Sequence, residues 1–176
     1  MPTAIPPSGK PLISSEQISS RIATLGQQIS ADLAGEKETV LLTVADGALI
    51  FSADLSRAVS IPIYMDQIAV SSYEGTASSG KINLRTEPRL DLTGKNILLV
   101  DDILDTGRTI SYLISYLVQF NPNRIYICVM LDKPSGRKVP VRADYVGFEV
   151  PDKFVIGYGM DYDGLYRNLP AIYSLD

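Results

Sequence analysis

Three aspartates follow a short apolar run in the stretch NILLVDDILDTGRTI. Asp101 and Asp102 come directly after five mostly apolar residues, and Asp105 follows three residues later, ahead of Thr-Gly-Arg-Thr. Ionised groups are costly to remove from water, so carboxylates that adjoin a buried strand need a chemical reason to be there. Carboxylate oxygens suit Mg²⁺ as ligands, and they accept hydrogen bonds from the hydroxyl groups of a sugar.

The segment after these aspartates has the composition of a phosphate-binding turn. A helix is expected to begin near Thr109, and the N–H groups at its positive end would point toward a bound anion. Gly107 allows close approach of the backbone, and the hydroxyl groups of Thr106 and Thr109 add donors. The stretch matches neither the Walker nor the dinucleotide-binding pattern. Carboxylates beside a phosphate cradle suit a sugar phosphate; the alternative is an acidic surface turn that only caps the helix.

The composition removes several classes of catalytic site. The chain contains no histidine, which excludes Ser-His-Asp and Cys-His nucleophile systems and most zinc sites. A general acid or base must therefore be a carboxylate, a lysine or a tyrosine. The one cysteine, Cys128, lies in the apolar run RIYICVML. We expect it to be a buried strand residue, because no histidine is present to activate the thiol.

Charge and hydropathy narrow the partners and the compartment. The net charge is −4 and the isoelectric point about 4.8, which argues against a nucleic-acid-binding surface. No apolar run approaches the roughly 18 residues that cross a bilayer. The first residues, MPTAIPPSGKPLIS, lack the apolar core of a secretory signal. We therefore expect a cytoplasmic protein that binds neither nucleic acid nor membrane, with residues 1–13 as an extended lead-in.

The rest of the chain alternates between strand and helix patterns, which predicts an α/β fold with a doubly wound, mostly parallel sheet flanked by helices. The first helix follows Ser14 or Ser15 and has apolar residues at three- and four-residue steps from Ile18 to Leu33. No domain-scale linker is visible, so residues 1–176 are expected to form a single domain. The predicted helices are 15–34, 48–59 and one from about residue 109; the predicted strands are 39–44, 61–70, 96–100, 124–131 and 143–150, with extended structure at 81–86.

Residues 71–80, SSYEGTASSG, have almost no large apolar side chains. A segment that cannot bury itself is typical of a mobile loop. It is either a functional lid over a neighbouring site or an exposed hairpin tip.

The stretch VDDILDTGRT resembles the phosphoribosyl pyrophosphate (PRPP) motif of the type I phosphoribosyltransferases. Four further stretches resemble the hypoxanthine-guanine branch of that superfamily: FSADLSR, SSY, LDKPSGR and VGFEVPDKFVIGYGMDYDGLYRNLP. The resemblance covers residues 15–170. It implies the type I phosphoribosyltransferase fold, with a small hood formed by the N- and C-terminal segments.

The resemblance implies roles for the acidic turn. Asp101 and Asp102 would face the ribose hydroxyls and the associated Mg²⁺, with Asp161 as a second metal position. Asp105 would be the general base, close to N7 of the purine, whose proton it would accept; the alternative is that it only orients the turn. The residues that would bind PRPP and its phosphates are Asp101, Asp102, Asp105, Thr106, Gly107, Arg108, Thr109, Gly47 and Arg167.

The purine site is implied in the same way. Lys133 is a donor-only side chain that suits the O6 carbonyl and opposes the amino group of adenine. Phe154 would stack on the base, and the backbone of Val155 would read its edge. Ser72 and Tyr73 match a flexible loop that closes over the reaction centre and excludes water. The alternatives are a solvated Lys133, a Phe154 in the core, and ordinary surface charges at Asp161 and Arg167.

One residue departs from the family pattern. The first loop, VADGALIF, carries Asp46 where a lysine or arginine is expected. An acidic side chain beside pyrophosphate is unfavourable unless it points away or acts through Mg²⁺. The family also suggests a non-proline cis peptide bond at Ala45–Asp46.

The implied activity is purine salvage: transfer of the phosphoribosyl group from PRPP to hypoxanthine or guanine, with Mg²⁺, by a homodimer or homotetramer. The alternatives are a phosphoribosyltransferase for xanthine or another base, and a non-catalytic regulator that senses nucleotides on the same fold. A donor to O6 serves hypoxanthine, guanine and xanthine alike, so the sequence does not rank them.

Overall fold

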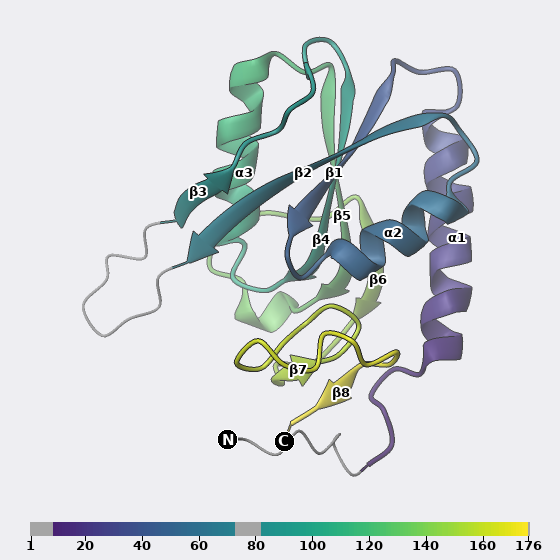
Figure 1. Ribbon diagram of the computed structural model, residues 1–176, viewed down its shortest axis with the longest axis vertical. Helices are drawn as coiled ribbons and strands as arrows, with labels where there is room; N and C mark the ends of the chain where they lie inside the picture. The colour runs from purple at the N-terminus through teal and green to yellow at the C-terminus, as the bar shows by residue number, and fades with distance from the viewer. Residues whose placement is uncertain (1–8, 73–81, 176) are drawn as a thin grey trace.

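A six-stranded sheet forms the centre of the computed structural model, which describes residues 9–72 and 82–175 (Figure 1). Its strands are β1 (Thr39–Ala45), β2 (Ile63–Ser72), β3 (Ile82–Thr86), β4 (Asn96–Leu104), β5 (Arg124–Asp132) and β6 (Tyr145–Glu149). The helices are α1 (Ser15–Leu33), α2 (Leu49–Ala58) and α3 (Arg108–Leu117), with short 3₁₀ turns η1 (Val118–Phe120) and η2 (Pro134–Gly136).

The sheet has the order β3-β2-β1-β4-β5-β6, and all neighbouring strands except one pair are parallel. Only β3 runs antiparallel, against β2. Residues 39–44 of β1 are all buried, as expected for a parallel strand that is covered on both faces. The predicted doubly wound, mostly parallel sheet is confirmed.

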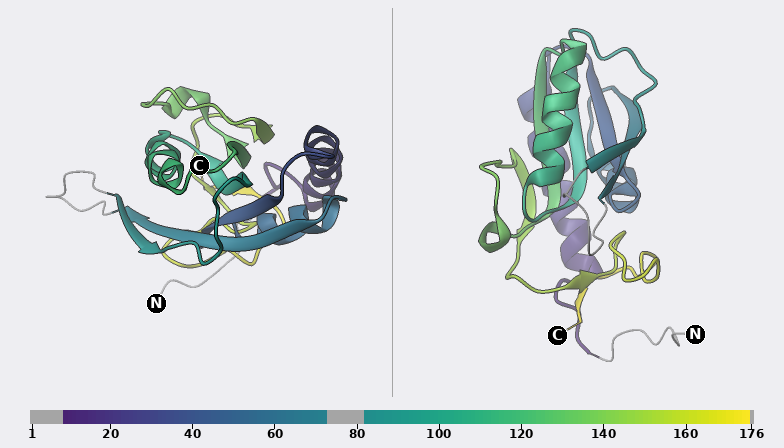
Figure 2. Two further views of the ribbon diagram at one scale, coloured as in Figure 1. Left: turned by 90° about the horizontal axis from the view of Figure 1, so that it is seen from above. Right: turned by 90° about the vertical axis from the view of Figure 1, so that its left-hand side faces the viewer.

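Helices cover both faces of the sheet (Figure 2). Helices α1 and α2 share one core with Leu41 and Leu98, whereas α3 shares the other with Val40 and Ile97. Alternate residues of β1 and β4 therefore face opposite cores, which is the two-residue period of a strand. Cys128 lies in the first core, where burial raises the pKa of its thiol, so the expectation of a buried strand cysteine is confirmed.

The predicted first helix, 15–34, is observed as α1 with an end one residue earlier. Its start is set by a capping box: the Gln17 amide donates to Ser14 Oγ at 3.3 Å, and the Ser14 amide donates to Gln17 Oε1 at 2.9 Å. This reciprocal pair identifies Ser14 as the N-cap and Ser15 as the first helical residue.

The strand that leads to the aspartates is longer than predicted. We expected it to end at Val100, but β4 continues to Leu104 because its pairing with β5 continues to Leu104 opposite Asp132. Asp101 and Asp102 therefore lie on the last part of the strand, whereas Asp105 is the first residue after it.

A second, small sheet lies beyond the carboxyl ends of the parallel strands (Figure 1). It consists of β7 (Val155–Ile156) and β8 (Tyr173–Ser174), which pair antiparallel. Ile13 joins this region through backbone hydrogen bonds with Ile172, at 3.2 and 3.0 Å. Residues 154–175 together with Ile13 are called the hood below. The hood that the resemblance implied is present.

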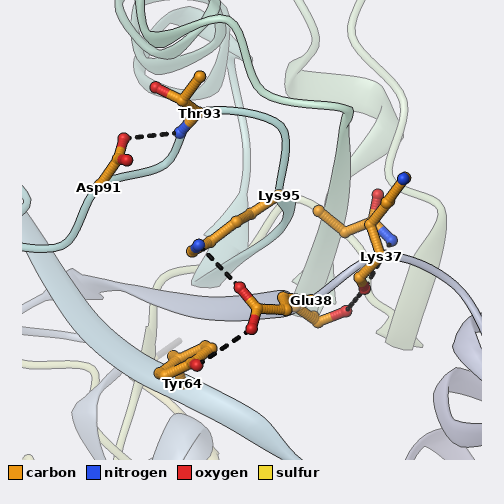
Figure 3. A network of polar contacts seen from close by, with 8 residues as sticks. Lys37, Glu38, Tyr64, Asp91, Thr93 and Lys95 are labelled. Atoms are coloured by element: carbon orange, nitrogen blue, oxygen red, sulfur yellow. Dashed lines mark hydrogen bonds and ion pairs between the residues drawn. The ribbon is translucent and has the colours of Figure 1, made fainter.

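The amino ends of the strands carry a network of paired charges (Figure 3). Lys95 Nζ lies 2.8 Å from Glu38 Oε2, and the Tyr64 hydroxyl donates to Glu38 Oε1 at 3.2 Å. The hydrogen bond from Lys95 lowers the pKa of Glu38. At this edge of the sheet, opposite the hood, the Glu38 carboxylate is therefore already paired with Lys95 and Tyr64.

Parts of two predicted segments lie outside the described residues. Of the predicted loop 71–80, Ser71 and Ser72 are the last residues of β2, opposite Asn83 and Ile82, so the loop starts later than expected. Tyr73 and the rest of that loop are not among the described residues, nor are residues 1–8 of the predicted lead-in. Within the described ranges, no helix is both long and apolar enough to cross a membrane.

Candidate active site

Two adjacent carboxylates stand at the carboxyl end of β4. Asp101 is buried, and its Oδ1 accepts a hydrogen bond from the Asp102 amide at 3.0 Å. Burial and the negative charge of Asp102 raise the pKa of Asp101 well above its usual range. Burial also raises the pKa of Asp102, although hydrogen bonds and the positive charge of Arg167 offset part of this effect. A cation or hydroxyl donors at this place would favour the ionised pair.

The first loop, after β1, packs directly against these carboxylates. A Cβ atom at Gly47 would lie 1.9 Å from Asp102 Oδ2, so only glycine fits there with the carboxylate in its present position. On the other side, a Cβ atom at Gly159 of the hood would lie 2.0 Å from the Gly47 carbonyl oxygen. Three segments that are distant in sequence therefore meet at Gly47.

The cis peptide bond that the resemblance suggested at Ala45–Asp46 is present. Asp46, the departure from the family pattern, is exposed. Its carbonyl oxygen accepts the Leu49 amide at 3.3 Å, at the start of α2.

The predicted phosphate-binding turn connects β4 to α3. Gly107 has a φ of 81° and precedes α3, which begins at Arg108, one residue before the predicted start. The Thr106 carbonyl oxygen accepts hydrogen bonds from the Lys138 and Val139 amides, at 3.0 and 3.1 Å. The N–H groups of the first helical turn have no acceptors within the helix, so this turn can bind an anion.

Arg137, part of the stretch LDKPSGR and without a role predicted from the sequence, fixes the loop after β5 to this turn. Its Nε donates to the Asp105 carbonyl oxygen at 2.8 Å and its Nη2 to the Leu104 carbonyl oxygen at 3.1 Å. It also pairs with Asp132 and donates to the Val141 carbonyl oxygen. Its carbonyl partners at Leu104 and Asp105 are distant in the chain, so the sequence did not reveal these contacts.

The side chain of Asp105 reaches the same loop. A Cβ atom at Gly136 would lie 2.0 Å from Asp105 Oδ1. The absence of a side chain at residue 136 therefore leaves the space that the Asp105 carboxylate occupies. The arrangement places the candidate general base between the phosphate turn and the loop that carries Lys133.

Lys133 is a buried residue rather than a solvated loop lysine. It is 6% exposed, its amide donates to the Leu104 carbonyl oxygen at 3.0 Å, and its Nζ donates to the Lys153 carbonyl oxygen. An ammonium group has three donors, so others are available for a ligand. The contact with Lys153 brings Lys133 beside Phe154, the next residue along the chain.

Phe154 is 49% exposed, so it does not belong to the core. Its ring lies edge-on to that of Tyr162, with centroids 5.7 Å apart and an interplanar angle of 88°. Val155, by contrast, is buried in β7 opposite Ser174. The exposed face of Phe154 can accept a flat ring by stacking.

Asp161 and Arg167 form an ion pair within the hood, with 2.7 Å between Nη2 and Oδ1. Asp161 Oδ2 also accepts the Gly164 amide at 2.8 Å, and Arg167 Nη1 donates to the Gly159 carbonyl oxygen at 2.6 Å. Arg167 therefore stands beside the contact between Gly159 and the first loop, with Asp102 near its positive charge.

No cluster of three or more metal-binding side chains occurs within residues 9–72 and 82–175. Mg²⁺ commonly takes one or two carboxylates and completes its shell with water and substrate phosphate oxygens. Asp101 and Asp102 match that requirement. Of the loop residues assigned to closure, Ser72 ends β2, and Tyr73 lies beyond the described part of the chain.

Carboxylates and a helix N-terminus at the carboxyl edge of a parallel sheet define an α/β protein that binds its ligand at this edge. The model of the phosphoribosyl transferase domain matches residues 12–163. The hypoxanthine-guanine phosphoribosyltransferase of Aquifex aeolicus is 43% identical over 168 residues, which are 95% of this chain and 94% of that protein. The enzyme of the same name from Mycobacterium avium is 42% identical, over 94% of this chain and 84% of that protein.

Solved structures of related enzymes have the same fold as this chain. The crystal structure of a hypoxanthine-guanine phosphoribosyltransferase from Bacillus anthracis, with HEPES in its active site, has a TM-score of 0.90 and 40% identity. The match covers 96% of this chain and 99% of the Bacillus anthracis chain. A hypoxanthine phosphoribosyltransferase variant from Trypanosoma cruzi, in a ternary complex with substrates, has a TM-score of 0.88 and 40% identity, over 95% of both chains. The chain belongs to the phosphoribosyltransferase family, and the relatives described here are hypoxanthine-guanine or hypoxanthine phosphoribosyltransferases.

Proposed function

We propose that this protein transfers the phosphoribosyl group of PRPP to hypoxanthine or guanine and releases pyrophosphate. The observation that carries the proposal is that the buried Lys133 donates to the Lys153 carbonyl oxygen, one residue before the exposed Phe154, at the sheet edge that bears the acidic turn. A donor-only group beside a stacking surface recognises a flat ring with a carbonyl oxygen, as in a 6-oxopurine. The family relationship over nearly the whole chain supports the same activity.

In the proposed reaction, purine N9 forms a bond to ribose C1 while the bond from C1 to the pyrophosphate oxygen breaks. While it is ionised, Asp105 offsets the positive charge that develops on the ribose, and as the new bond forms it accepts the proton from purine N7 and becomes neutral. Asp101 and Asp102 would bind the ribose hydroxyls and would hold Mg²⁺, whose positive charge would offset the negative charge of the pyrophosphate.

The remaining residues bind and orient the substrates. The amides of residues 106–109, with the hydroxyls of Thr106 and Thr109, hold the 5′-phosphate. The Gly47 amide and Arg167 bind pyrophosphate, and the exposure of Asp46 is compatible with an acidic residue in this loop. Phe154 stacks on the purine, and the Val155 backbone reads its edge.

The proposal is tested by steady-state assays with Mg²⁺ and PRPP, in which hypoxanthine, guanine, xanthine and adenine are offered separately. We expect turnover of 6-oxopurines and none of adenine. Lys133→Met should lower kcat/KM for hypoxanthine by about 10- to 100-fold, because a charged hydrogen bond is lost. Adenine turnover comparable to that of hypoxanthine would contradict the assignment of Lys133.

The second candidate, a regulator that senses nucleotides, is favoured only by Asp46 in place of a basic residue in the first loop. It predicts that PRPP binds but that no base is turned over. The same assays, combined with calorimetric titration of PRPP, separate the two functions.

We also propose that the protein forms a homodimer or homotetramer. Leu49 and Met65 are 45% and 50% exposed and line a recess of 330 Å³ together with Ser52. The Ser52 hydroxyl is buried, and within the described residues it has no hydrogen-bond partner. A second copy of the chain would cover the apolar side chains. Light scattering of Met65→Lys should show a smaller assembly than the wild type if this surface forms the interface.

Two coarser proposals complete the assignment. We propose that residues 1–176 form one domain, and that the protein acts in the cytoplasm. The single cysteine, Cys128, is buried and unpaired, which fits a reducing compartment.

A further inference from the structure

The hood is joined to α2 by a hydrogen bond between two side chains. The Tyr158 hydroxyl donates to Asp54 Oδ2, and Asp54 also pairs with Arg57 one helical turn further on. Tyr158 is buried, and burial together with this hydrogen bond raises the pKa of its hydroxyl. The hydroxyl therefore keeps its proton at neutral pH and remains a donor.

The residue after Tyr158 contacts the first loop. Gly159 lies against the Gly47 carbonyl oxygen, as described above. Its amide donates to the Arg167 carbonyl oxygen at 2.9 Å, and its own carbonyl oxygen accepts Arg167 Nη1 at 2.6 Å. Displacement of Tyr158 would therefore move both groups that are proposed to bind pyrophosphate, the Gly47 amide and Arg167.

The other partner, Asp54, is connected to the same loop through its helix. Helix α2 begins at Leu49, two residues after Gly47, and Asp54 lies in the middle of it. The contact between Asp54 and Tyr158 thus closes a ring that runs through α2, the first loop, Gly159 and back to Tyr158. A closed ring of this kind restrains the distance between Gly47 and Arg167.

One side of this contact faces a cavity. A cavity of 570 Å³ lies between α1, α2 and the hood, and Asp54 and Tyr158 are part of its wall, with Ile22 and Pro170. Tyr158 also packs in one apolar core with Ile22 of α1 and Leu55 of α2, so the hydrogen bond adds a specific link between the hood and α2 to that apolar contact.

We propose that Tyr158 and Asp54 are positioning residues for the pyrophosphate end of PRPP. Through Gly159 and Gly47 they keep the groups that bind pyrophosphate in place, and they do not touch the substrate. The inference rests on the proposed function, because that function places pyrophosphate between Gly47 and Arg167. It adds a contact outside the site that determines affinity for PRPP and pyrophosphate, but not for the purine.

The chain offers a matched control. Tyr145 is buried as well, and its hydroxyl donates to Asp32 Oδ2 at 3.1 Å, between β6 and α1. Tyr145→Phe and Tyr158→Phe each remove one hydroxyl from a buried tyrosine that donates to an aspartate. Only the second lies next to the first loop, so the pair separates positioning from general stabilisation.

The test is calorimetric titration of each variant with Mg²⁺-PRPP and with Mg²⁺-pyrophosphate, together with KM and kcat for PRPP and hypoxanthine. We expect Tyr158→Phe to bind both ligands about three- to tenfold more weakly, with the KM for hypoxanthine unchanged. Tyr145→Phe should bind like the wild type, although both variants lose thermal stability. Asp54→Ala should reproduce Tyr158→Phe, and Asp54→Asn, which keeps an acceptor oxygen, should bind close to the wild type.

The outcomes distinguish the inference from the proposed function. If the wild type binds PRPP and Tyr158→Phe binds it as tightly as Tyr145→Phe does, the positioning role is wrong and the proposed function stands. A wild-type protein that binds neither PRPP nor pyrophosphate would overturn both. If PRPP binds without turnover of any base, the titrations still decide the positioning role.

Discussion

Asp66 on β2 and Asp101 on β4 are both buried aspartates of the same sheet, 5% and 6% exposed, yet their surroundings have opposite effects. Burial alone would raise the pKa of Asp66, but the amides of Leu90, Gln67 and Arg89 donate to its carboxylate and lower the pKa overall. Asp101 accepts the Asp102 amide and faces a second carboxylate, and its pKa is raised.

The comparison shows that burial does not decide whether a carboxylate is structural or available for chemistry. Asp66 has its donors from the protein and holds the segment after β3 against β2. Asp101 accepts one amide, and the hydrogen bonds of Asp102 offset only part of the effect of burial, so the pKa of each stays raised. A cation or hydroxyl donors from a ligand would therefore stabilise their ionised forms most. Glu38, at the amino end, is a third case, in which Lys95 and the Tyr64 hydroxyl are the partners that lower the pKa of the carboxylate (Figure 3).

The largest effect is expected from Asp101→Asn. Loss of the charge should lower kcat/KM for PRPP by about a hundredfold or more, since it removes an oxygen proposed to face the ribose and Mg²⁺. The same change should raise the melting temperature at pH 7. The folded-state pKa of Asp101 is raised, so its ionisation costs stability above that pKa, and an uncharged amide avoids the cost. A melting temperature of Asp101→Asn below that of the wild type would contradict the conclusion that the ionised Asp101 destabilises the fold.

Asp66→Asn should have the opposite signature. We expect a loss of roughly 2–3 kcal/mol in the free energy of unfolding, because charge-assisted hydrogen bonds are weakened and an amide NH₂ group meets backbone donors. The pKa of Asp66 is lowered in the folded state, so its contribution is fully present above the unfolded value of about 3.9. It is lost as the pH falls through the folded-state pKa.

Urea unfolding of the wild type and Asp66→Asn, at pH 7 and at decreasing pH down to about 2, measures this contribution. The difference between the two proteins should shrink as Asp66 becomes protonated. A difference that does not change with pH would mean that the charge of Asp66 is not the source of its stabilisation.

Gly136→Ala tests the carboxylate that follows Asp101 and Asp102 along the chain. The new methyl group would displace Asp105 Oδ1, the nearest atom, by rotation of a flexible side chain. We expect kcat to fall about tenfold, because the candidate general base moves from its position, with little change in melting temperature. Gly9→Ala is the control, since its Cβ atom would meet nothing within 4 Å. Equal kcat values for the two variants would argue against the role of Asp105.

The smallest effect is expected at the amino end of the sheet. Glu38→Gln removes the exposed ion pair with Lys95, so the loss of stability should be small and should diminish as salt is added. The KM for PRPP should not change. Melting temperatures at low and high salt, with parallel assays, check both statements; a changed KM would show that the two ends of the sheet are coupled.

Several features of the fold were predictable because their signals are local in the sequence. The apolar steps from Ile18 to Leu33 and the serine before them predicted α1 to within one residue at its end. The apolar run before Asp101 predicted a central strand, and Gly107 predicted the turn before α3. The alternation of strand and helix signals was sufficient to predict the fold class.

Other features depend on partners that are distant in the chain. Strand β4 extends to Leu104 because β5 continues to pair with it. The residue types at 101–104 do not predict this extension. Arg137 and Asp66 were not singled out, because their importance lies in carbonyl oxygens and amides of other loops. The solvated alternative for Lys133 was excluded only when the contact with the Lys153 carbonyl oxygen was seen.

The sequence by itself determined the sheet, its helices and the identity of the acidic turn, because periodicity, capping and turn residues act over a few neighbouring positions. The tertiary structure alone decided which buried aspartates have donors that outweigh the effect of burial on the pKa and which do not. It also placed Gly47 between Asp102 and Gly159, and Tyr158 within reach of Asp54. Electrostatic environment and close approach depend on segments far apart in the chain, so they exist only once the chain is folded.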